Sequence, residues 1–173
     1  MTTFITNTPV MGVDLNNSMT TASMQKNSAG TAIPPHALLT KVLGSYDTEW
    51  LFVVANGAVS AGDCVTVNAS GTCTRATTAG PQTATNTIAF AQNAFADTDY
   101  GWVAVKGKNL TIAVSATTAN ATVLYIATTS GKLSTTSASA TLSGIQLANA
   151  SATATTTTTT GNLTWPRCIS VGF

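Results

Sequence analysis

After the first forty residues, apolar positions recur in short runs that end at turn signals. Residues 49–55 begin with Glu49 and continue as an apolar, aromatic and β-branched run that stops at Asn56-Gly57, which predicts a buried strand followed by a turn. Residues 64–67 alternate between apolar and polar, and residues 73–76 return after an Asn-Ala-Ser-Gly sequence, which predicts a hairpin. Further strands are predicted at the remaining apolar segments, which are 87–95, 100–106, 110–114, 122–128, 132–134 and 142–147.

Seven to ten short strands, with turn signals about every 8–12 residues, are typical of a sandwich or a barrel. No alternation of strands with amphipathic helices suggests an α/β protein. The sequence therefore predicts an all-β fold, a small antiparallel β-barrel or sandwich. Gly107 is expected to mark a turn or a bulge between the segments 100–106 and 110–114.

Residues 1–40 have scattered apolar positions without a period and end at Ile33-Pro34-Pro35, which neither a helix nor a central strand accepts. We expect an extended N-terminal arm, with one short turn or helix near 14–25, and a β domain over 41–173. A poorly ordered terminus is the alternative. The apolar side chains of the arm need a surface to lie on, and the candidate partner contacts are Phe4, Ile5, Val10 and Met11.

Charged residues make up 8% of the chain, against roughly 25% in an average soluble domain. Thr makes up about a fifth, and its β-branched side chain suits a pleated, half-exposed surface. The segment near 148–160 is so rich in Thr that a loop or an edge strand is expected there. The formal net charge is +1, so neither nucleic acid nor an anionic membrane is an expected partner. No apolar run reaches the length of a membrane span.

The first residues resemble no secretion signal, so we expect the protein to stay in the compartment where it is made. Three cysteines are too few, and odd in number, for a disulfide framework. Cys64 and Cys73 flank the predicted hairpin turn and could face each other across it. Reduced, half-buried thiols are nevertheless the favoured interpretation for both and for Cys168.

Few residues offer catalytic chemistry. The single histidine, His36, follows two prolines and is expected to be a solvated loop residue. A serine triad would depend on it, yet the Gly-x-Ser-x-Gly signature is absent. Zinc would need clustered Cys and His. The sequence therefore predicts neither an enzyme nor a metal or cofactor site.

Two carboxylate pairs remain, Asp47 with Glu49 and Asp97 with Asp99. Such pairs serve glycosidases or Ca²⁺ sites, but the spacing of a Ca²⁺ loop is missing. Turn chemistry, with carboxylates bonded to nearby backbone N–H groups, is favoured for the second pair.

The aromatic residues are expected in the core. Trp50 and Phe52 lie two apart and share one strand face. The missing side chain of Gly101 could let the Trp102 indole pack over the backbone, and core packing is favoured over carbohydrate stacking for all the aromatic residues.

Three segments resemble a known class of proteins. Residues 55–65 combine a strand end with a turn and an Ala-Gly-Asp that opens the next strand, and residues 89–107 contain Tyr-Gly-Trp-Val followed by a glycine. Residues 124–133 continue the pattern. This region, roughly 45–135, resembles the decoration, or cement, proteins of tailed-bacteriophage capsids and related head proteins.

The resemblance implies a small β-barrel, often trimeric, that an N-terminal arm anchors on the capsid. The expected function is that of a structural virion protein. It would bind the outer surface of the major capsid protein shell and stabilise it, after assembly in the bacterial cytoplasm. The alternative is a displayed adhesin or fibre-tip module that recognises a glycan or a cell surface. A glycosidase or esterase that uses Asp97, Asp99 or His36 is the least favoured reading.

Overall fold

The structure, a computed structural model, describes residues 13–78, 86–115, 123–135, 141–147 and 158–169. Within these ranges the chain is all-β, as predicted, with twelve strands and no helix. The strands are β1 (Gln25–Lys26), β2 (Ala32–Ile33), β3 (Lys41–Gly44), β4 (Thr48–Ala55), β5 (Cys64–Val67), β6 (Thr72–Arg75), β7 (Thr87–Ala91), β8 (Tyr100–Ala113), β9 (Leu124–Ile126), β10 (Leu133–Ser134), β11 (Thr141–Leu147) and β12 (Thr158–Ile169).

Five strands close into a barrel in the order β4-β8-β7-β5-β6, and β6 pairs with β4 again. The closing pair is parallel, with Val54 opposite Thr72, and the other four pairs are antiparallel. The lumen is filled by side chains, as a barrel of this size requires. They are mostly small or β-branched, namely Leu51, Val53, Ala55, Val59, Val65, Val67, Cys73, Ala89, Ala91, Phe95, Val103 and Val105.

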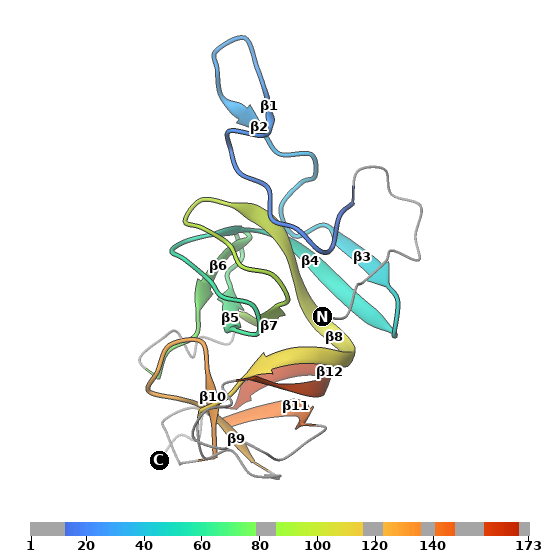
Figure 1. The fold of residues 1–173 in the computed structure, drawn as a ribbon, viewed down its shortest axis with the longest axis vertical. Coiled ribbons are helices and arrows are strands. Elements are labelled where there is room, and N and C mark those ends of the chain that lie inside the picture. The colour runs from blue at the N-terminus through green and yellow to red at the C-terminus, as the bar shows by residue number, and fades with distance from the viewer. Residues whose placement is uncertain (1–12, 79–85, 116–122, 136–140, 148–157, 170–173) are drawn as a thin grey trace.

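Strand β8 belongs to the barrel and to a second group of strands. Its first half pairs with β4 and β7, and its second half pairs with β12, beyond which lie β11, β9 and β10 (Figure 1). The predicted bulge at Gly107 is confirmed by shifts in the pairing register around it. The strand predicted at 110–114 is confirmed for residues 110–113, and it continues from the segment 100–106 through the bulge as one strand.

Side chains and loops also connect the two groups of strands. The Gln92 side chain accepts a hydrogen bond from Thr111 N at 2.8 Å and donates one to Thr111 O at 3.0 Å. Strand β7 ends before this point of β8. The side-chain amide of Gln92 therefore makes the two hydrogen bonds to Thr111 that a neighbouring strand would otherwise make. Ala113 N donates to Gly62 O at 2.8 Å, which continues this substitution one step further.

The sequence predicts a loop or an edge strand near 148–160, and the last three residues of this segment form part of a strand in the structure. Thr158, Thr159 and Thr160 are in β12, where they pair with Ala113, Ile112 and Thr111 of β8. Among the described residues, β8 is the only strand that pairs with Thr158–Thr160, because the pairing of β11 with β12 ends at Leu147 opposite Gly161. Residues 148–157 lie outside the described part of the chain.

A second core cluster covers the outer face of the barrel wall. Trp50, Phe52 and Trp102 are at most 1% exposed and pack together, which confirms both the shared face of Trp50 and Phe52 and their place in the core. Leu15 and Leu38, from the segment before β3, cover this aromatic cluster. The predicted arm is therefore partly built into the body of the protein.

Gly101 has a role that the sequence analysis did not predict. A Cβ atom at Gly101 would collide with the ring of Phe95, so the missing side chain makes room for Phe95. Gly101 pairs with Val53 within the barrel wall. The glycine therefore lets an aromatic ring reach the end of the lumen.

We predict that Gly101→Ala lowers the free energy of unfolding by about 1–3 kcal/mol, the usual range for overpacking a core. The φ angle of Gly101 is not positive, so the cost comes from the contact with Phe95. Urea denaturation measures it. Combined with Phe95→Leu, the substitution should cost less than the sum of the two single changes. Additive costs would contradict the contact.

Candidate functional site

The carboxylates Asp97 and Asp99 fix a turn. Asp99 Oδ2 accepts a hydrogen bond from Ala96 N at 2.9 Å, which confirms the predicted turn chemistry. Asp97 Oδ1 accepts from Gly57 N at 2.7 Å and so joins two turns distant in sequence. Both groups are therefore used in holding loops at one end of the barrel.

The other carboxylate pair forms ion pairs on the surface. Lys106 Nζ lies 3.1 Å from Asp47 Oδ1 and 3.4 Å from Glu49 Oε1. These hydrogen bonds, first of all the one to Asp47, raise the pKa of Lys106. A carboxylate neutralised by a lysine is a poor general acid or nucleophile, so the arrangement suits a structural ion pair.

His36 is not the solvated loop residue that the sequence predicts. Its ring packs against those of Phe52 and Trp102, each at a centroid distance of 5.3 Å. His36 Nε2 and Trp102 Nε1 are buried, and neither has a hydrogen-bond partner among the described residues. The fold places the histidine over the aromatic cluster because the chain returns to the barrel at this point.

All three cysteines are free, as expected, but two are more deeply buried than predicted. Cys64 and Cys73 are fully buried and belong to different core clusters, on opposite faces of the barrel wall. They do not face each other across the hairpin, because Val67 is opposite Cys73 and Phe90 is opposite Cys64. Burial raises the pKa of Cys64 strongly and that of Cys73 to about 11.

Sequence reasoning missed a buried ion pair between Asp63 and Arg75. Arg75 Nε lies 2.9 Å from Asp63 Oδ2, and the Asp63 side chain is 3% exposed. Arg75 also donates to Ser130 O at 2.9 Å, and Gly131 leaves space for the carboxylate. Burial raises the pKa of Asp63 in spite of its hydrogen bond from Ser60 N and its ion pair. The pair connects the barrel to the β9–β10 turn.

The described residues contain no group of three or more His, Cys, Asp or Glu side chains that could hold a metal ion. Within the same residues, no helix is long and apolar enough to cross a membrane. The titratable groups described above are dispersed among turns, ion pairs and core. The site with the clearest means of binding another molecule is formed by the segment before β3.

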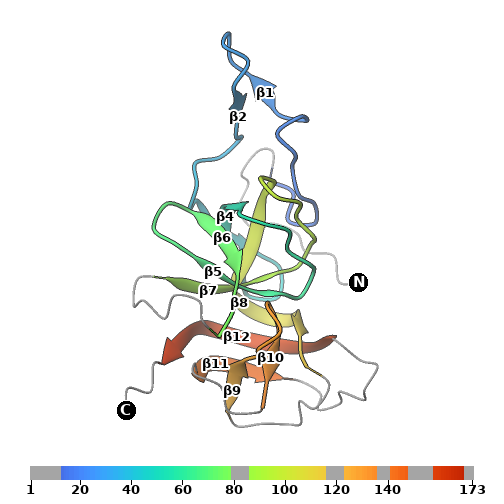
Figure 2. The same ribbon diagram turned by 90° about the vertical axis from the view of Figure 1, so that its left-hand side faces the viewer.

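This segment forms a hairpin that stands away from the barrel (Figures 1 and 2). Strands β1 and β2 pair with Gln25 opposite Ile33, and the turn is closed by Asn27, whose Oδ1 accepts from Ala29 N and Thr31 N. The expected extended arm is thus replaced by a hairpin in this part of the chain. The turn residues Asn27 and Gly30 are the signal from which sequence analysis could have predicted it.

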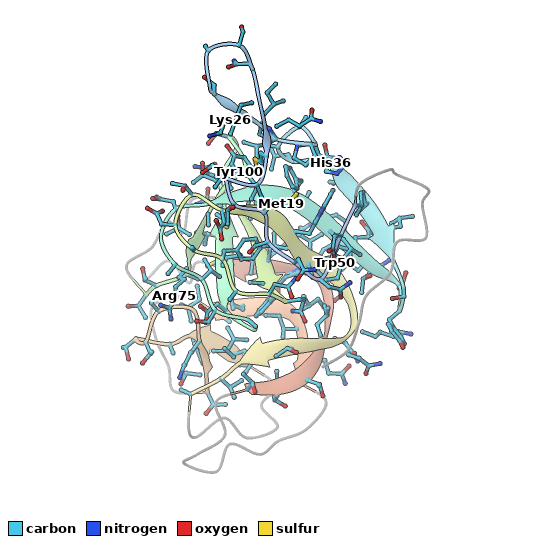
Figure 3. The ribbon with its side chains drawn as sticks, turned by 45° about the horizontal axis from the view of Figure 1, so that its top comes forward. Met19, Lys26, His36, Trp50, Arg75 and Tyr100 are labelled. Atoms are coloured by element: carbon cyan, nitrogen blue, oxygen red, sulfur yellow. The ribbon has the colours of Figure 1, made fainter. Side chains whose placement is uncertain are left out.

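The two chain segments that connect the hairpin to the barrel are both held by contacts with the barrel. On the incoming side, Asn93 Nδ2 donates to Leu15 O at 2.8 Å, and Met19 exchanges backbone hydrogen bonds with Tyr100 at 2.7 and 2.8 Å. On the outgoing side, His36 packs on the aromatic cluster, and Leu39 N donates to Phe52 O at 2.8 Å. Figure 3 shows Met19 and Tyr100 near the barrel and Lys26 above them.

A hollow of about 520 Å³ lies at the base of the hairpin. It is lined mainly by apolar side chains, which are Met19, Met24, Ile33, Pro34 and Pro35, together with Ser23 and Gln25. Ile33 is 50% exposed and lies beside the other apolar residues of the hollow, so the exposed apolar surface is contiguous. Methionine is adaptable in shape and is often used on binding surfaces. The hairpin and the hollow, residues 19–35, are called the hairpin site below.

The predicted contact residues Phe4, Ile5, Val10 and Met11 lie outside the described residues. The hairpin site lies in the same predicted arm but uses other residues. It became visible only when the backbone pairing between β1 and β2 was known.

Comparison with family models, with curated proteins and with solved structures finds no match to this chain. The likeness to phage decoration proteins therefore stays a prediction from the sequence.

We predict that the difference in the free energy of unfolding between the wild type and Asp63→Asn increases as the pH falls. At neutral pH the substitution should cost about 1–2 kcal/mol, less than a fully buried pair because Arg75 is partly exposed. The folded pKa of Asp63 is raised, so the folded protein binds this proton more tightly than the unfolded chain. The wild type therefore gains stability relative to Asp63→Asn as the pH falls towards 3.8. Urea unfolding at several pH values measures the difference, and a difference that shrinks on acidification would contradict the raised pKa.

We predict that a thiol reagent such as dithionitrobenzoate modifies at most Cys168 rapidly in the folded protein. Cys64 and Cys73 have no exposed surface, and their raised pKa values leave little thiolate at mild alkaline pH. All three thiols should react in denaturant. Rapid native modification that persists in Cys168→Ser would show that a barrel cysteine is accessible.

Proposed function

We propose that this protein is a structural component of a bacteriophage virion that binds the outer surface of the major capsid protein shell and stabilises it. The observation that carries the proposal is the hairpin site, which projects from a closed barrel and presents apolar surface. The sequence resemblance to capsid decoration proteins supports the same function.

Energetic considerations favour a partner for the hairpin site. A two-stranded hairpin is at best marginally stable in water, and β1 and β2 have two residues each. The segments on either side of the hairpin are nevertheless held by core packing and by backbone hydrogen bonds, so the position of the hairpin is defined before binding. A preorganised apolar projection loses little conformational entropy when it inserts between other subunits.

The barrel is well suited to serve as the scaffold that carries this hairpin. Closure of five strands satisfies most backbone groups and limits unwanted edge pairing. The chain carries few charges, so contacts must come mainly from apolar burial and backbone hydrogen bonds. These properties fit a component that is held in an assembly and performs no chemistry.

The proposed partners are the major capsid protein and further copies of this chain, and a trimer is the assembly that the resemblance implies. Several copies on one shell would make weak individual contacts tight in combination. Assembly in the bacterial cytoplasm, a reducing compartment, agrees with three free cysteines.

The test is co-sedimentation of the purified chain with empty shells of the phage that encodes it. We predict that Ile33→Asp weakens binding at least tenfold, about 1.4 kcal/mol, because it places a charge on the apolar hairpin site. The matched control is Val123→Asp, which changes a side chain of similar exposure next to β9, at the other end of the molecule (Figure 1).

Equal binding of both variants would contradict the role of the hairpin site. Removal of residues 1–12 then tests the contact residues predicted from the sequence, Phe4, Ile5, Val10 and Met11. Absence of shell binding by the wild type, together with binding to glycans or cells, would favour a displayed adhesin.

A further inference from the structure

Within the described part of the chain, strand β3 is paired along one side of its backbone only. It is the last strand at its end of the ten-stranded sheet, and it pairs with β4 along its other side. Among the residues that the structure describes, no strand pairs with the open side. An edge of this kind is a template for pairing with another strand.

The hydrogen-bond pattern identifies the open backbone groups. Phe52 N donates to Thr40 O at 2.9 Å, so the next pair, Lys41 opposite Leu51, is a non-hydrogen-bonded pair. Alternation makes Leu43 opposite Glu49 non-hydrogen-bonded as well. The N–H and C=O groups of Lys41 and Leu43 therefore point away from β4, towards the open side.

One exposed apolar side chain lies on β3, and a second lies within reach of Lys41. Leu43 is 53% exposed, and Trp165 of β12 is 38% exposed. The two lie on one surface, because Lys41 Nζ is 4.8 Å from the centroid of the Trp165 ring. These exposed side chains and the open backbone of β3 form what we call the β3 edge.

The backbone at Trp165 supports a binding role. Its φ angle is +52°, in the left-handed region that a large side chain adopts only at an energetic cost. The pairing register of β11 and β12 shifts here, opposite Gly144, whose φ angle is also positive. Strain of this kind persists where the surrounding structure enforces it, and here it keeps an indole on the surface beside an open strand.

We infer that the β3 edge binds the β3 edge of a second copy of this chain, in an antiparallel pair centred on Val42. Lys41 of one copy then lies opposite Leu43 of the other, and each pair exchanges two backbone hydrogen bonds. Leu43 of each copy comes to lie beside Lys41 of its neighbour, on the face of β3 where Lys41 contacts the Trp165 ring. Part of the exposed apolar surface of Leu43 is thus covered by the aliphatic stem of that lysine.

Charge complementarity favours a second copy over another partner. Lys41 lies at the start of β3, and two carboxylates, Asp47 and Glu49, flank its other end and share the single Lys106. Antiparallel pairing brings Lys41 of each copy towards these carboxylates of the other. A lysine on an edge strand usually discourages pairing, but this lysine would face the acidic end of the same surface.

This contact goes beyond the shell-binding role and does not depend on it. Its two-fold symmetry joins copies in pairs. A chain that is otherwise monomeric would form a dimer.

Light scattering of the full-length chain over a range of concentrations tests the pairing. We expect an even number of copies at high concentration and a dissociation constant that Leu43→Asp raises at least tenfold. Val123→Asp, the exposed control, should leave the constant unchanged. A mass that corresponds to a monomer or a trimer at every concentration would overturn the inference, as would equal effects of the two substitutions.

The register is tested by disulfide trapping in a Cys168→Ser background. In the inferred pair the Cα atoms of residues 41 and 43 of the two copies are about 5.5 Å apart, within disulfide range. A mixture of Lys41→Cys and Leu43→Cys chains should cross-link rapidly on oxidation, whereas each variant alone should not. Cross-linking of a single variant, or none in the mixture, would overturn the proposed register.

Two further measurements separate the explanations. If pairing appears only after removal of residues 1–12, the N-terminal segment of the same chain is the occupant of the β3 edge and the inference is wrong. Leu43→Asp should retain shell binding, and Ile33→Asp should retain pairing. Failure of one proposal is therefore distinguishable from failure of the other.

Discussion

The close contact between Gly107 and Thr48 is the constraint on which the two groups of strands depend. A Cβ atom at Gly107 would collide with the Thr48 side chain, so only glycine lets β8 cross β4 at this point and bend into the second group. Thr48 Oγ1 donates to Ser45 O at 2.7 Å and accepts from Trp50 Nε1 at 2.8 Å. The bend, the β3–β4 turn and the aromatic cluster are therefore positioned together.

The aromatic cluster in turn positions the segment that precedes the barrel. Leu15, His36 and Leu38 cover it from outside, so burial of Trp50, Phe52 and Trp102 requires the segment to leave and return at set places. Most of the residues between these places project as a hairpin, although Met19 still packs against the core. A projecting hairpin with Ile33 half exposed is thus a consequence of how the core is closed, and it gives the proposed shell contact a rigid base.

Several elements followed from local sequence because their signals are local. The run 49–55 and the glycine-containing turns at 56–57 and 68–71 determine strand ends through backbone preferences that hold in any context. Failures occurred where a distant contact decided the outcome. His36 looks solvated beside two prolines until Phe52 and Trp102 are placed beneath it, and Thr158–Thr160 look like a loop until they pair with β8. The arm contacts Phe4, Ile5, Val10 and Met11 stay predictions.

From the amino-acid order one can read an all-β chain with few charges, three reduced thiols and little catalytic chemistry, because these depend on residue types and on a period of two. Barrel closure through β4 and β6, the ion pair of Asp63 with Arg75, and the two exposed surfaces at Ile33 and Leu43 depend on which strands become neighbours. Neighbours in a sheet are chosen by the total burial of many side chains, and that sum is defined only once the whole chain has folded.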